Sequence, residues 1–378
     1  MDTTHCVPMT IDERNRLNFS GGPGALPLVV LEQLRDALRE APGAGLSLLG
    51  VSHRSDWFAA VVAELQDNVR RLLNLPDSYQ VLFLQGGATQ QFTMIPMTLL
   101  AGRARPADYL HTGYWSGKAL PEARREGPVR ALWSGQAHGF DRLPGDDELD
   151  FSPDAPYLHY VSNETVEGLQ FHRLIGRDDV PRVCDMSSDF LSGPGDFSRY
   201  SLIYAHAQKN LGPSGVTVVV LKNGILKNAP PPGALPGFLD YRQQIAASSI
   251  LNTPPVFAIY AVLLVTRWLR DAMGGLDAMG RVNAAKARLL YQQIDDSDGF
   301  YLPHVANKVD RSLMNVVFKL PTPELHNRFL QAAAHAGFSG LGGHRSIGGI
   351  RASLYNGLEL YAVEKLAGFM REFRRRPA

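Results

Sequence analysis

Cysteine is scarce in this chain, with only Cys6 and Cys184 among 378 residues. Two cysteines cannot form the disulfide framework of a small secreted protein, so we expect a reducing, cytoplasmic location. Long apolar runs are missing as well: the longest, residues 256–265, is about half of the ~20 residues that a bilayer-spanning helix needs. Residues 1–17 lack a basic region followed by an apolar core, so we expect neither a secretory signal nor a membrane partner.

An excess of either charge is also missing, because 38 lysines and arginines balance 37 aspartates and glutamates. A net charge of +1 gives no overall basic field for nucleic acid, which we do not expect as a partner. Hydrophobic residues make up 45% of the chain and charged residues 20%, which is typical of a globular protein. A chain of this length exceeds one ordinary core, so two domains are expected.

Short apolar segments alternate with helical patterns in the first half of the chain. The pattern at 57–73 places Trp57, Val61, Leu65 and Val69 on one helical face. Strand–helix alternation predicts an α/β fold with a mainly parallel sheet covered by helices, and a ligand at the carboxyl ends of the strands. The segments that we interpret as strands are apolar on both faces, as a covered sheet requires; they are 81–84, 157–161, 182–184, 202–204 and 216–221.

The pattern changes after about residue 257. Two long helical patterns, 257–273 and 276–294, precede three apolar segments near Phe300, Val316 and Ala352, and a helix at about 359–374 closes the chain. This part predicts a smaller α+β domain. We therefore divide the chain into a large cofactor-binding domain, 17–260, and a small C-terminal domain, 261–378. Residues 1–16 form an N-terminal extension, for which packing on the small domain is one option.

Lys209 lies between two strongly apolar segments, 202–204 and 216–221. Burial there would lower its pKa and favour the neutral amine that a Schiff base requires, although a loop lysine reaching into solvent is an equal alternative. Asp185 ends another apolar segment, where an acid alone is more often a helix cap. Together the two residues fit pyridoxal 5′-phosphate, which needs a lysine for its aldehyde and an acid to keep its pyridine nitrogen protonated.

A phosphate site should accompany such a pair. The segment Gln-Gly-Gly-Ala-Thr-Gln-Gln-Phe at 85–92 follows a predicted strand and opens a helical pattern. Small residues at such a turn allow backbone N–H groups and the helix N-terminus to face a phosphate. Most glycines of this kind only form turns, so the motif gains its meaning from its combination with Lys209 and Asp185.

The segment His-Ala-Gln-Lys-Asn-Leu-Gly-Pro-Ser-Gly at 206–215 resembles the cofactor-lysine segment of the phosphoserine aminotransferase family, which has the fold-type-I architecture of pyridoxal phosphate enzymes. The likeness covers nearly the whole chain from Asn18 onward. Further stretches match in the same order: Asn-Phe-Ser-Gly-Gly-Pro at 18–23, Ser-His-Arg at 52–54, Gly-Tyr-Trp at 113–115, Ser-Asn-Glu-Thr at 162–165, Asn-Thr-Pro-Pro at 252–255 and Gly-His-Arg-Ser-Ile-Gly-Gly-Ile-Arg-Ala-Ser at 343–353.

The resemblance implies roles for particular residues around the cofactor. Lys209 would form the Schiff base and Asp185 would pair with the pyridinium nitrogen. The other implied cofactor contacts are Trp115 on the ring face, Thr165 at the phenolic oxygen, Gln208 with Ala88 and Thr89 at the phosphate, and Asn252 and Thr253 at the phosphate of the neighbouring subunit of a homodimer. Two departures from the family pattern are Gly21, where members commonly have a hydroxyl residue or alanine, and Ala88-Thr89, where some have Gly-Arg.

Basic residues in glycine-rich or small-residue turns suit anion recognition, because arginine can grip a carboxylate or phosphate with two parallel hydrogen bonds. By the resemblance, Arg351 binds the α-carboxylate of the substrate. The candidate residues for its distal phosphate or carboxylate are His53, Arg54 from the partner subunit, His344 and Arg345.

The resemblance therefore implies an aminotransferase of serine biosynthesis, and no metal site. It would interconvert O-phospho-L-serine and 2-oxoglutarate with 3-phosphohydroxypyruvate and L-glutamate, and would also accept 4-phosphohydroxy-L-threonine in pyridoxine biosynthesis. The alternatives are a desulfurase or lyase on the same fold, an alanine–glyoxylate-type transaminase, and an inactive binding scaffold. A desulfurase needs a reactive cysteine, and neither Cys6 in the unmatched N-terminus nor Cys184 in a predicted core strand suits that task.

Overall fold

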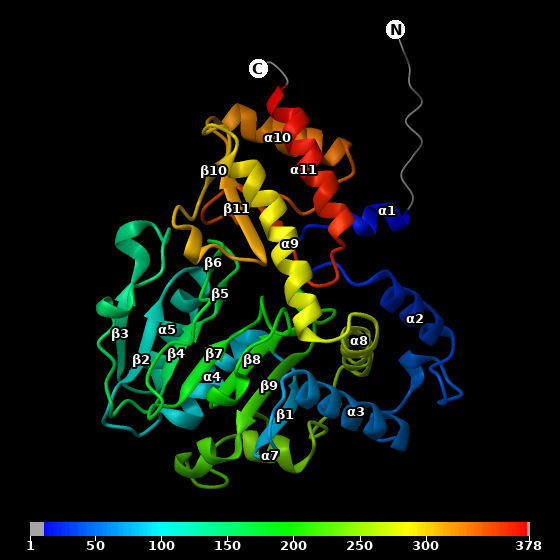
Figure 1. Ribbon diagram of the computed structural model, residues 1–378. Helices are drawn as coiled ribbons and strands as arrows, with labels where there is room; N and C mark the ends of the chain where they lie inside the picture. Colours follow the sequence, from blue (N-terminus) through cyan, green and yellow to red (C-terminus); the bar gives the residue numbers. More distant parts are fainter. Residues whose placement is uncertain (1–10, 376–378) are drawn as a thin grey trace.

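A computed structural model describes residues 11–375 and places a seven-stranded sheet at the centre of this part of the chain (Figure 1). The strand order is β1-β9-β8-β7-β4-β2-β3; β9 is antiparallel to both of its neighbours, and the other pairs are parallel. The strands are β1 (Tyr79–Leu84), β2 (Ala107–His111), β3 (Val129–Ser134), β4 (Leu158–Val161), β7 (Arg182–Asp185), β8 (Leu202–His206) and β9 (Thr217–Lys222). All five predicted strands are present, and the predicted α/β fold with a mainly parallel sheet is confirmed.

Helices cover both faces of this sheet because its strands are apolar on both faces. In β1, Leu82 and Leu84 pack with one set of helices, whereas Val81 and Phe83 pack with the other, as alternation along a strand requires. The first set contains α4 (Gly87–Leu99), α5 (Tyr114–Glu126) and α7 (Tyr241–Ala246), and the second contains α2 (Leu28–Arg39), α3 (Asp56–Leu72) and α8 (Val256–Arg267).

Two shorter elements lie close to the carboxyl ends of the strands. A small hairpin, β5 (Asn163–Glu164) and β6 (Leu169–Gln170), follows β4, and the single-turn helix α6 (Ala207–Asn210) joins β8 to β9. Lys209 is part of α6, so the predicted lysine turn between apolar strands is a short helix.

The C-terminal part forms a second unit with its own core, above the large sheet in Figure 1. Its antiparallel sheet contains β10 (Leu302–Pro303), β11 (Asn315–Lys319) and β12 (Ile350–Ser353). Its helices are α9 (Leu276–Asp295), α10 (Pro323–His335) and α11 (Leu360–Arg375). Leu17 and Phe19 from the N-terminal part of the chain also pack in this core.

The expected boundary between residues 260 and 261 falls inside α8, where apolar residues on both sides pack in the core of the large sheet. In α9, Leu276 and Met279 pack in that core, whereas Leu290 and Ile294 pack in the C-terminal core. We therefore propose that the two units divide along α9. Residues 1–10 of the expected extension, including Cys6, lie outside the described residues, and α1 (Ile11–Arg16) buries none of its residues.

Buried polar contacts join the two units at the residue that follows Lys209. Asn356, which follows β12, donates its backbone N–H to Asn210 Oδ1 in α6 at 2.8 Å. Its side chain accepts from Asn283 Nδ2 in α9, also at 2.8 Å. Lys286, a fully buried residue of α9, donates to the backbone carbonyls that surround Asn356.

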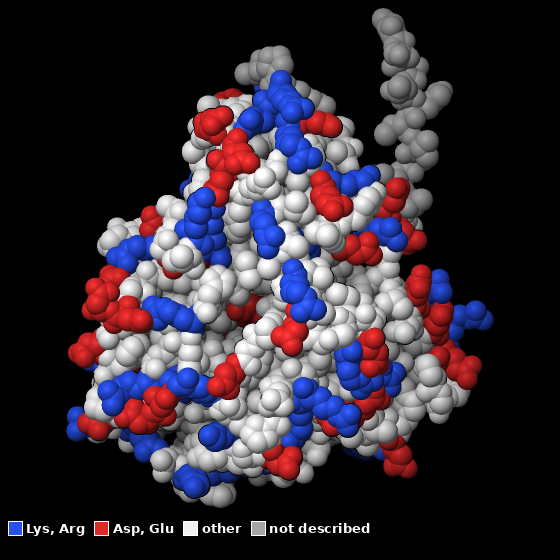
Figure 2. All heavy atoms as spheres, viewed as in Figure 1, with Lys and Arg blue, Asp and Glu red and all other residues white. Residues whose placement is uncertain are grey.

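The surface carries both charges over the same elements, and Figure 2 shows basic and acidic side chains interspersed on the displayed face. Within residues 11–375, no helix has both the length and the apolar character needed to cross a bilayer.

Candidate active site

Lys209 is buried at the end of α6 and faces the β5–β6 hairpin. Its Nζ atom donates to Thr165 Oγ1 at 2.6 Å and lies 4.9 Å from the centre of the Trp115 ring. Burial lowers the pKa of Lys209 to about 8, although the negative charges of Asp185 and Glu164 act in the opposite direction. A lysine with this pKa provides a substantial fraction of neutral amine near neutral pH, as a Schiff base requires.

Asp185 lies at the carboxyl end of β7, beside the strand that leads into α6. Its Oδ1 accepts a 2.8 Å hydrogen bond from the Ser187 backbone N–H. Burial raises the pKa of Asp185, and the positive charge of Lys209 lowers it again. The acid and the lysine predicted from sequence therefore meet at neighbouring strand ends, where their charges interact.

The N-terminus of α4 forms the third side of the site. Gly86 and Gly87 have φ angles of 87° and 71°, which glycine adopts without the strain that a side chain would cause. Ala88 and Thr89, in the first turn of α4, line the cavity. The first N–H groups of a helix have no acceptor within the helix, so this end of α4 suits an anion.

These three sides enclose a cavity of about 130 Å³. Six of its lining residues were predicted: Ala88, Thr89, Trp115, Asp185, Gln208 and Lys209. Gly87, Ser187 and His206 also line it and were not predicted. Burial, together with the positive charge of Lys209, lowers the pKa of His206 to about 4, so this ring is neutral at pH 7.

Arg351 reaches toward this region from β12. A Cβ atom at residue 21 would overlap the Arg351 guanidinium, so the glycine at that position leaves room for the arginine. The hydroxyl of Tyr355 donates to the Gly21 carbonyl at 3.0 Å and fixes this part of the N-terminal segment. Arg351 Nε is buried and has no hydrogen-bond partner among the described residues.

His344 and Arg345 lie in the turn before β12. The His344 ring lies 4.6 Å from the Tyr114 ring, at the start of α5 and next to Trp115. Burial, together with the charges of Arg351 and Arg345, lowers the pKa of His344. Arg345 is exposed, so the turn brings one basic residue against the site and leaves the next facing solvent.

The remaining predicted residues lie outside the lining of this cavity. Asn252 donates to Gln85 Oε1 at 3.4 Å, and the Thr253 carbonyl accepts from Gln85 Nε2 at 2.8 Å, so both lie beside the start of the glycine turn of their own chain. His53 and Arg54 lie in the loop before α3, where Arg54 is exposed.

Comparison with known proteins agrees with this geometry. The sequence model of the class-V aminotransferases matches residues 16–366. The chain belongs to the class-V aminotransferase family. Phosphoserine aminotransferase of Geobacillus kaustophilus is 49% identical over 359 residues, which cover 95% of this chain and 98% of that protein. The corresponding protein of Laribacter hongkongensis is 48% identical over 359 residues, with the same coverage.

Solved structures of the family are also similar. Phosphoserine aminotransferase from Bacillus circulans subsp. alkalophilus has a TM-score of 0.91 at 43% identity, covering 94% of this chain and 98% of that one. A pyridoxal phosphate-bound phosphoserine aminotransferase from Trichomonas vaginalis has a TM-score of 0.87 at 33% identity, covering 94% and 99%. The fold of this class-V aminotransferase is therefore the fold-type-I architecture.

The cavity of this class-V aminotransferase fits pyridoxal 5′-phosphate, the cofactor of the family. The chemistry of the donor set matches the cofactor: an amine for the aldehyde, a carboxyl for the pyridine nitrogen, and a helix N-terminus for the phosphate. Trp115 Nε1 is buried without a hydrogen-bond partner in the described part of the chain, so this N–H group can donate to a bound polar group. Among residues 11–375, no cluster of three or more His, Cys, Asp or Glu residues is suited to a metal ion.

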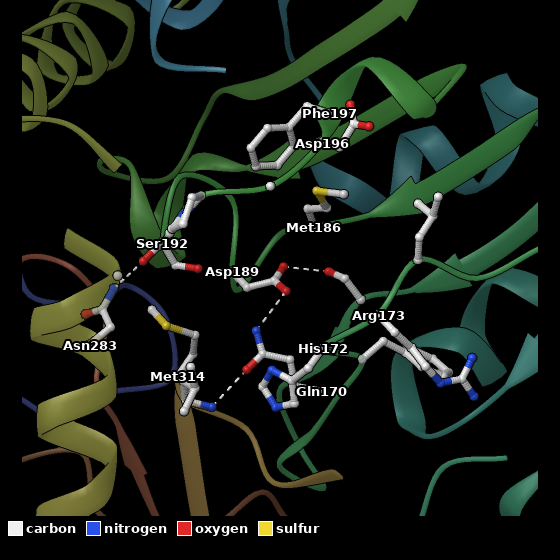
Figure 3. Close-up of a pocket in the computed structure, with 18 of the residues that line it drawn as sticks. Gln170, His172, Arg173, Met186, Asp189, Ser192, Asp196, Phe197, Asn283 and Met314 are labelled. Carbon is white, nitrogen blue, oxygen red and sulfur yellow. Dashed lines mark hydrogen bonds between the residues drawn. The ribbon is translucent and has the colours of Figure 1, made fainter. Parts of the chain in front are cut away.

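A larger cavity, of about 660 Å³, lies beside the segment that follows β7, and its lining contains neither Lys209 nor Asp185. Figure 3 shows Asp189 of that cavity facing Gln170. Asp189 accepts hydrogen bonds from Ser162 Oγ at 2.5 Å and from Gln170 Nε2 at 3.1 Å. Burial raises the pKa of Asp189 to about 7. Both oxygens of the Asp189 carboxyl have hydrogen-bond partners within the protein. We therefore assign Asp189 a role in holding the structure of the aminotransferase and no role in binding.

Proposed function

We propose that this aminotransferase interconverts O-phospho-L-serine and 2-oxoglutarate with 3-phosphohydroxypyruvate and L-glutamate, in the cytoplasmic pathway of serine biosynthesis. The observation that carries the proposal is that the C-terminal unit brings two basic side chains to the site. Arg351 lies beside Gly21, and His344 contacts Tyr114, the residue before Trp115. Phosphoserine and glutamate each carry an α-carboxylate and a second anionic group, and therefore need two such positions. The substrate named for the similar proteins supports this assignment.

Lys209 and Asp185 have the central chemical roles in this proposal. The bound cofactor supplies an electron sink for the carbanion formed at the α-carbon of the amino acid. Lys209 Nζ would hold the cofactor aldehyde, and its free amine would move the α-proton as general base and then as general acid. The lowered pKa of Lys209 suits both tasks. Asp185 holds a proton at the pyridine nitrogen.

The other residues proposed for the site bind and orient the cofactor and the substrate. The N-terminus of α4, with Ala88 and Thr89, and the Gln208 side chain hold the phosphate of the cofactor. Trp115, whose ring lies over Lys209 Nζ, would cover the face of the cofactor ring. Thr165, whose hydroxyl accepts from Lys209 Nζ, would donate to the phenolic oxygen of the cofactor. Arg351 grips the α-carboxylate of the substrate, and His344 with Arg345 bind the distal phosphate or carboxylate.

We further propose a homodimer in which each site is completed by the partner subunit. Arg54 would join the distal-anion pocket of the partner's site, and His53 would support it; Asn252 and Thr253 would reach the phosphate of the partner's cofactor. The support is that Arg54, Asn252 and Thr253 are exposed on the single chain, although each belongs to a stretch that matches the family. A pocket selective for a phosphorylated amino acid would also accept 4-phosphohydroxy-L-threonine.

The other assignments have less support. Cys184 lies in β7, and burial raises the pKa of its thiol well above the usual range, so it cannot act as the thiolate of a desulfurase. An alanine–glyoxylate aminotransferase from Nostoc is 18% identical, which indicates a common fold only. An inactive scaffold would not need the buried Lys209 and Asp185 pair.

The decisive experiment measures both half-reactions of the purified, cofactor-loaded protein with phosphoserine, serine, alanine and 4-phosphohydroxythreonine as donors, and with 2-oxoglutarate as acceptor. We expect phosphoserine to exceed serine in kcat/KM by several orders of magnitude. Lys209→Ala serves as the inactive control and should also lose the visible absorbance of the bound cofactor. Equal turnover of serine and phosphoserine would contradict the substrate assignment and leave the aminotransferase family intact.

A further inference from the structure

Two glutamates of the β5–β6 hairpin are buried close to the active site without a basic partner. Glu164 is 1% exposed and Glu167 is 2% exposed, and no lysine, arginine or histidine of the described residues lies within 4.0 Å of either carboxyl. Burying a carboxyl is costly unless hydrogen bonds or charges compensate. Lys209 acts on Glu164, and Arg351 on Glu167, through their charges and without a direct ion pair, so hydrogen bonds have to supply the rest of the compensation.

The N-terminus of α5 supplies that compensation. Glu164 Oε2 accepts from the Trp115 N–H at 3.0 Å, and its Oε1 accepts from the Ser116 N–H at 3.0 Å and from Thr112 Oγ1 at 3.3 Å. Glu167 Oε1 accepts from the Tyr114 N–H at 3.0 Å. The first N–H groups of a helix have no acceptor within the helix and carry its positive end, so they stabilise these acids.

Glycine at residue 113 allows this close approach. A Cβ atom there would lie 2.5 Å from Glu167 Oε2 and 2.7 Å from Glu164 Cδ, closer than packed atoms allow. The chain therefore enters α5 directly against both carboxyls, and the two side chains fix where the helix begins.

The two residues at that helix start face different parts of the active site. The ring of Trp115 lies over Lys209 Nζ, at 4.9 Å, on the cofactor side. The ring of Tyr114 contacts His344 at 4.6 Å, on the side of the proposed distal-anion pocket. Each carboxyl thus holds the backbone of one of these aromatic residues.

We propose that Glu164 and Glu167 form a two-carboxyl clamp on the start of α5, in which Glu164 positions Trp115 against the cofactor and Glu167 positions Tyr114 against His344. Both are positioning residues, since they act through the aromatic side chains. The clamp rests on the proposed function, which assigns the roles of Trp115 and His344. It adds that both roles depend on the β5–β6 hairpin.

The two acids differ in their hydrogen bonds, although burial raises the pKa of both. Both oxygens of Glu164 accept from donors, which suits a carboxylate, whereas Glu167 Oε2 has no hydrogen-bond partner in the described structure. The groups that face Glu167 are Glu164 on β5, Tyr114 on α5 and Arg351 on β12. Burial and the negative charge of Glu164 raise the pKa of Glu167 to about 9, so Glu167 carries a proton at pH 7.

Glutamine substitution separates the two positions. Glu164→Gln replaces an accepting oxygen by an amide NH₂ group that opposes a backbone N–H, and should weaken binding of pyridoxal phosphate to the apoenzyme on the order of tenfold. Glu167→Gln retains one acceptor for Tyr114 and resembles the protonated acid, so it should match the wild type at pH 7. Glu167→Leu removes the acceptor and should raise the KM for phosphoserine on the order of tenfold, with cofactor affinity unchanged.

Thr112→Val provides a milder perturbation in case Glu164→Gln fails to fold, because it removes only the hydroxyl donor at 3.3 Å. It should weaken cofactor binding in the same direction by a smaller factor. Asp240→Asn is the matched control: Asp240 is also a buried acid that accepts from a helix N-terminal N–H, that of Arg242, and it lies outside the cofactor cavity. Its cofactor affinity and KM should remain at wild-type values.

The cofactor titration needs no substrate, so it tests the clamp even if phosphoserine proves not to be the donor; the KM comparison is then made with whichever donor the wild type accepts. Unchanged cofactor affinity in both Glu164→Gln and Thr112→Val would overturn the role of Glu164. Two results would overturn the role of Glu167. One is a KM at pH 7 that rises as much in Glu167→Gln as in Glu167→Leu. The other is a lower kcat with an unchanged KM in Glu167→Leu.

Discussion

Lys209 Nζ donates to Thr165 Oγ1 at 2.6 Å, which joins the helix after β8 to the hairpin after β4 across the cofactor cavity. The two residues belong to different strand connections, and the bond holds the Lys209 side chain against the hairpin. The hydroxyl thereby occupies one of the three N–H donors of the ammonium while burial lowers the pKa of that group to about 8.

Uptake of the cofactor should depend on pH through Lys209. The neutral amine attacks the aldehyde, and a pKa near 8 means that the neutral fraction rises as pH increases through 8, well below the 10.5 of an ordinary lysine. The rate at which the apoenzyme takes up pyridoxal phosphate, followed by absorbance between pH 6 and 10, should level off above about pH 9. A rate that keeps rising to pH 10 would mean that Lys209 has an ordinary pKa.

Stability should depend on pH through Glu167. Its pKa is about 9 in the folded chain and 4.5 in the unfolded chain, so between these values the folded state holds a proton that the unfolded state has lost. The contribution to the free energy of unfolding is complete below pH 4.5 and declines as pH rises toward 9. Urea titrations of the wild type and of Glu167→Gln across this range should show a decline in the wild type that the variant lacks; parallel curves would contradict the protonated state.

Arg345 and Arg351 should separate distal-anion recognition from recognition of the α-carboxylate. Arg345 is exposed on the single chain, so the prediction applies to the proposed homodimer with substrate bound. A bidentate arginine contact in a partly dehydrated pocket is stronger than an exposed ion pair, so Arg345→Ala should lower kcat/KM for phosphoserine by roughly one to two orders of magnitude. Arg351→Ala should lower it for every amino acid donor, including serine. An unchanged kcat/KM for phosphoserine in Arg345→Ala would place the phosphate pocket elsewhere.

Inactive protomers should complement each other if the site is shared. In a hybrid of Lys209→Ala and Arg54→Ala protomers, one site combines an intact Lys209 with an intact Arg54 of the other subunit. Equal mixing should therefore restore about a quarter of the wild-type activity. Hybrid formation is verified with differently tagged protomers, and verified hybrids without activity would place Arg54 in the site of its own chain.

Gly21 should control the position of Arg351. A methyl group at residue 21 overlaps the guanidinium, so Gly21→Ala must displace the arginine. Because the end of an arginine side chain moves at low cost, we expect a change of about 1 kcal/mol or less in stability, together with a KM several-fold higher for all amino acid donors. A titration with each donor checks this; an unchanged KM would show that the guanidinium binds equally well from its displaced position.

Sequence reasoning identified the strands that carry Lys209 and Asp185 because those strands are apolar on both faces. It missed β2 and β3, since Asp108 in β2 pairs with Arg130 in the half-exposed β3, at 2.9 and 3.0 Å, and interrupts the apolar pattern. The sequence could not show to which core α8 belongs, because this helix is apolar on nearly all sides and has no periodic polar face. The expected domain boundary at residue 260 was therefore approximate.

Lys209, Asp185 and the segment 85–92 could be predicted because they lie at strand ends, and the other cofactor contacts were implied by the family resemblance. The support of α5 could not be predicted in either way. Glu167 and Tyr114 are far apart in sequence, and only the three-dimensional structure shows the bond between them. The one available signal was the presence of two acids in the polar segment 163–168 between apolar strands. Such acids also occur in ordinary surface turns, so this signal could not separate the clamp from a solvated hairpin.

The contact between Asn356 and Asn210 has a consequence for which part of the site can adapt to a substrate. It ties the segment after Arg351 to the residue next to Lys209. A second buried bond, from Asn163 Nδ2 in the hairpin to Asn315 Oδ1 in β11 at 2.8 Å, also joins the two units. Arg345, in contrast, lies in an exposed turn. Any adjustment to substrates of different length should therefore fall on the turn of Arg345 and not on the backbone of Arg351.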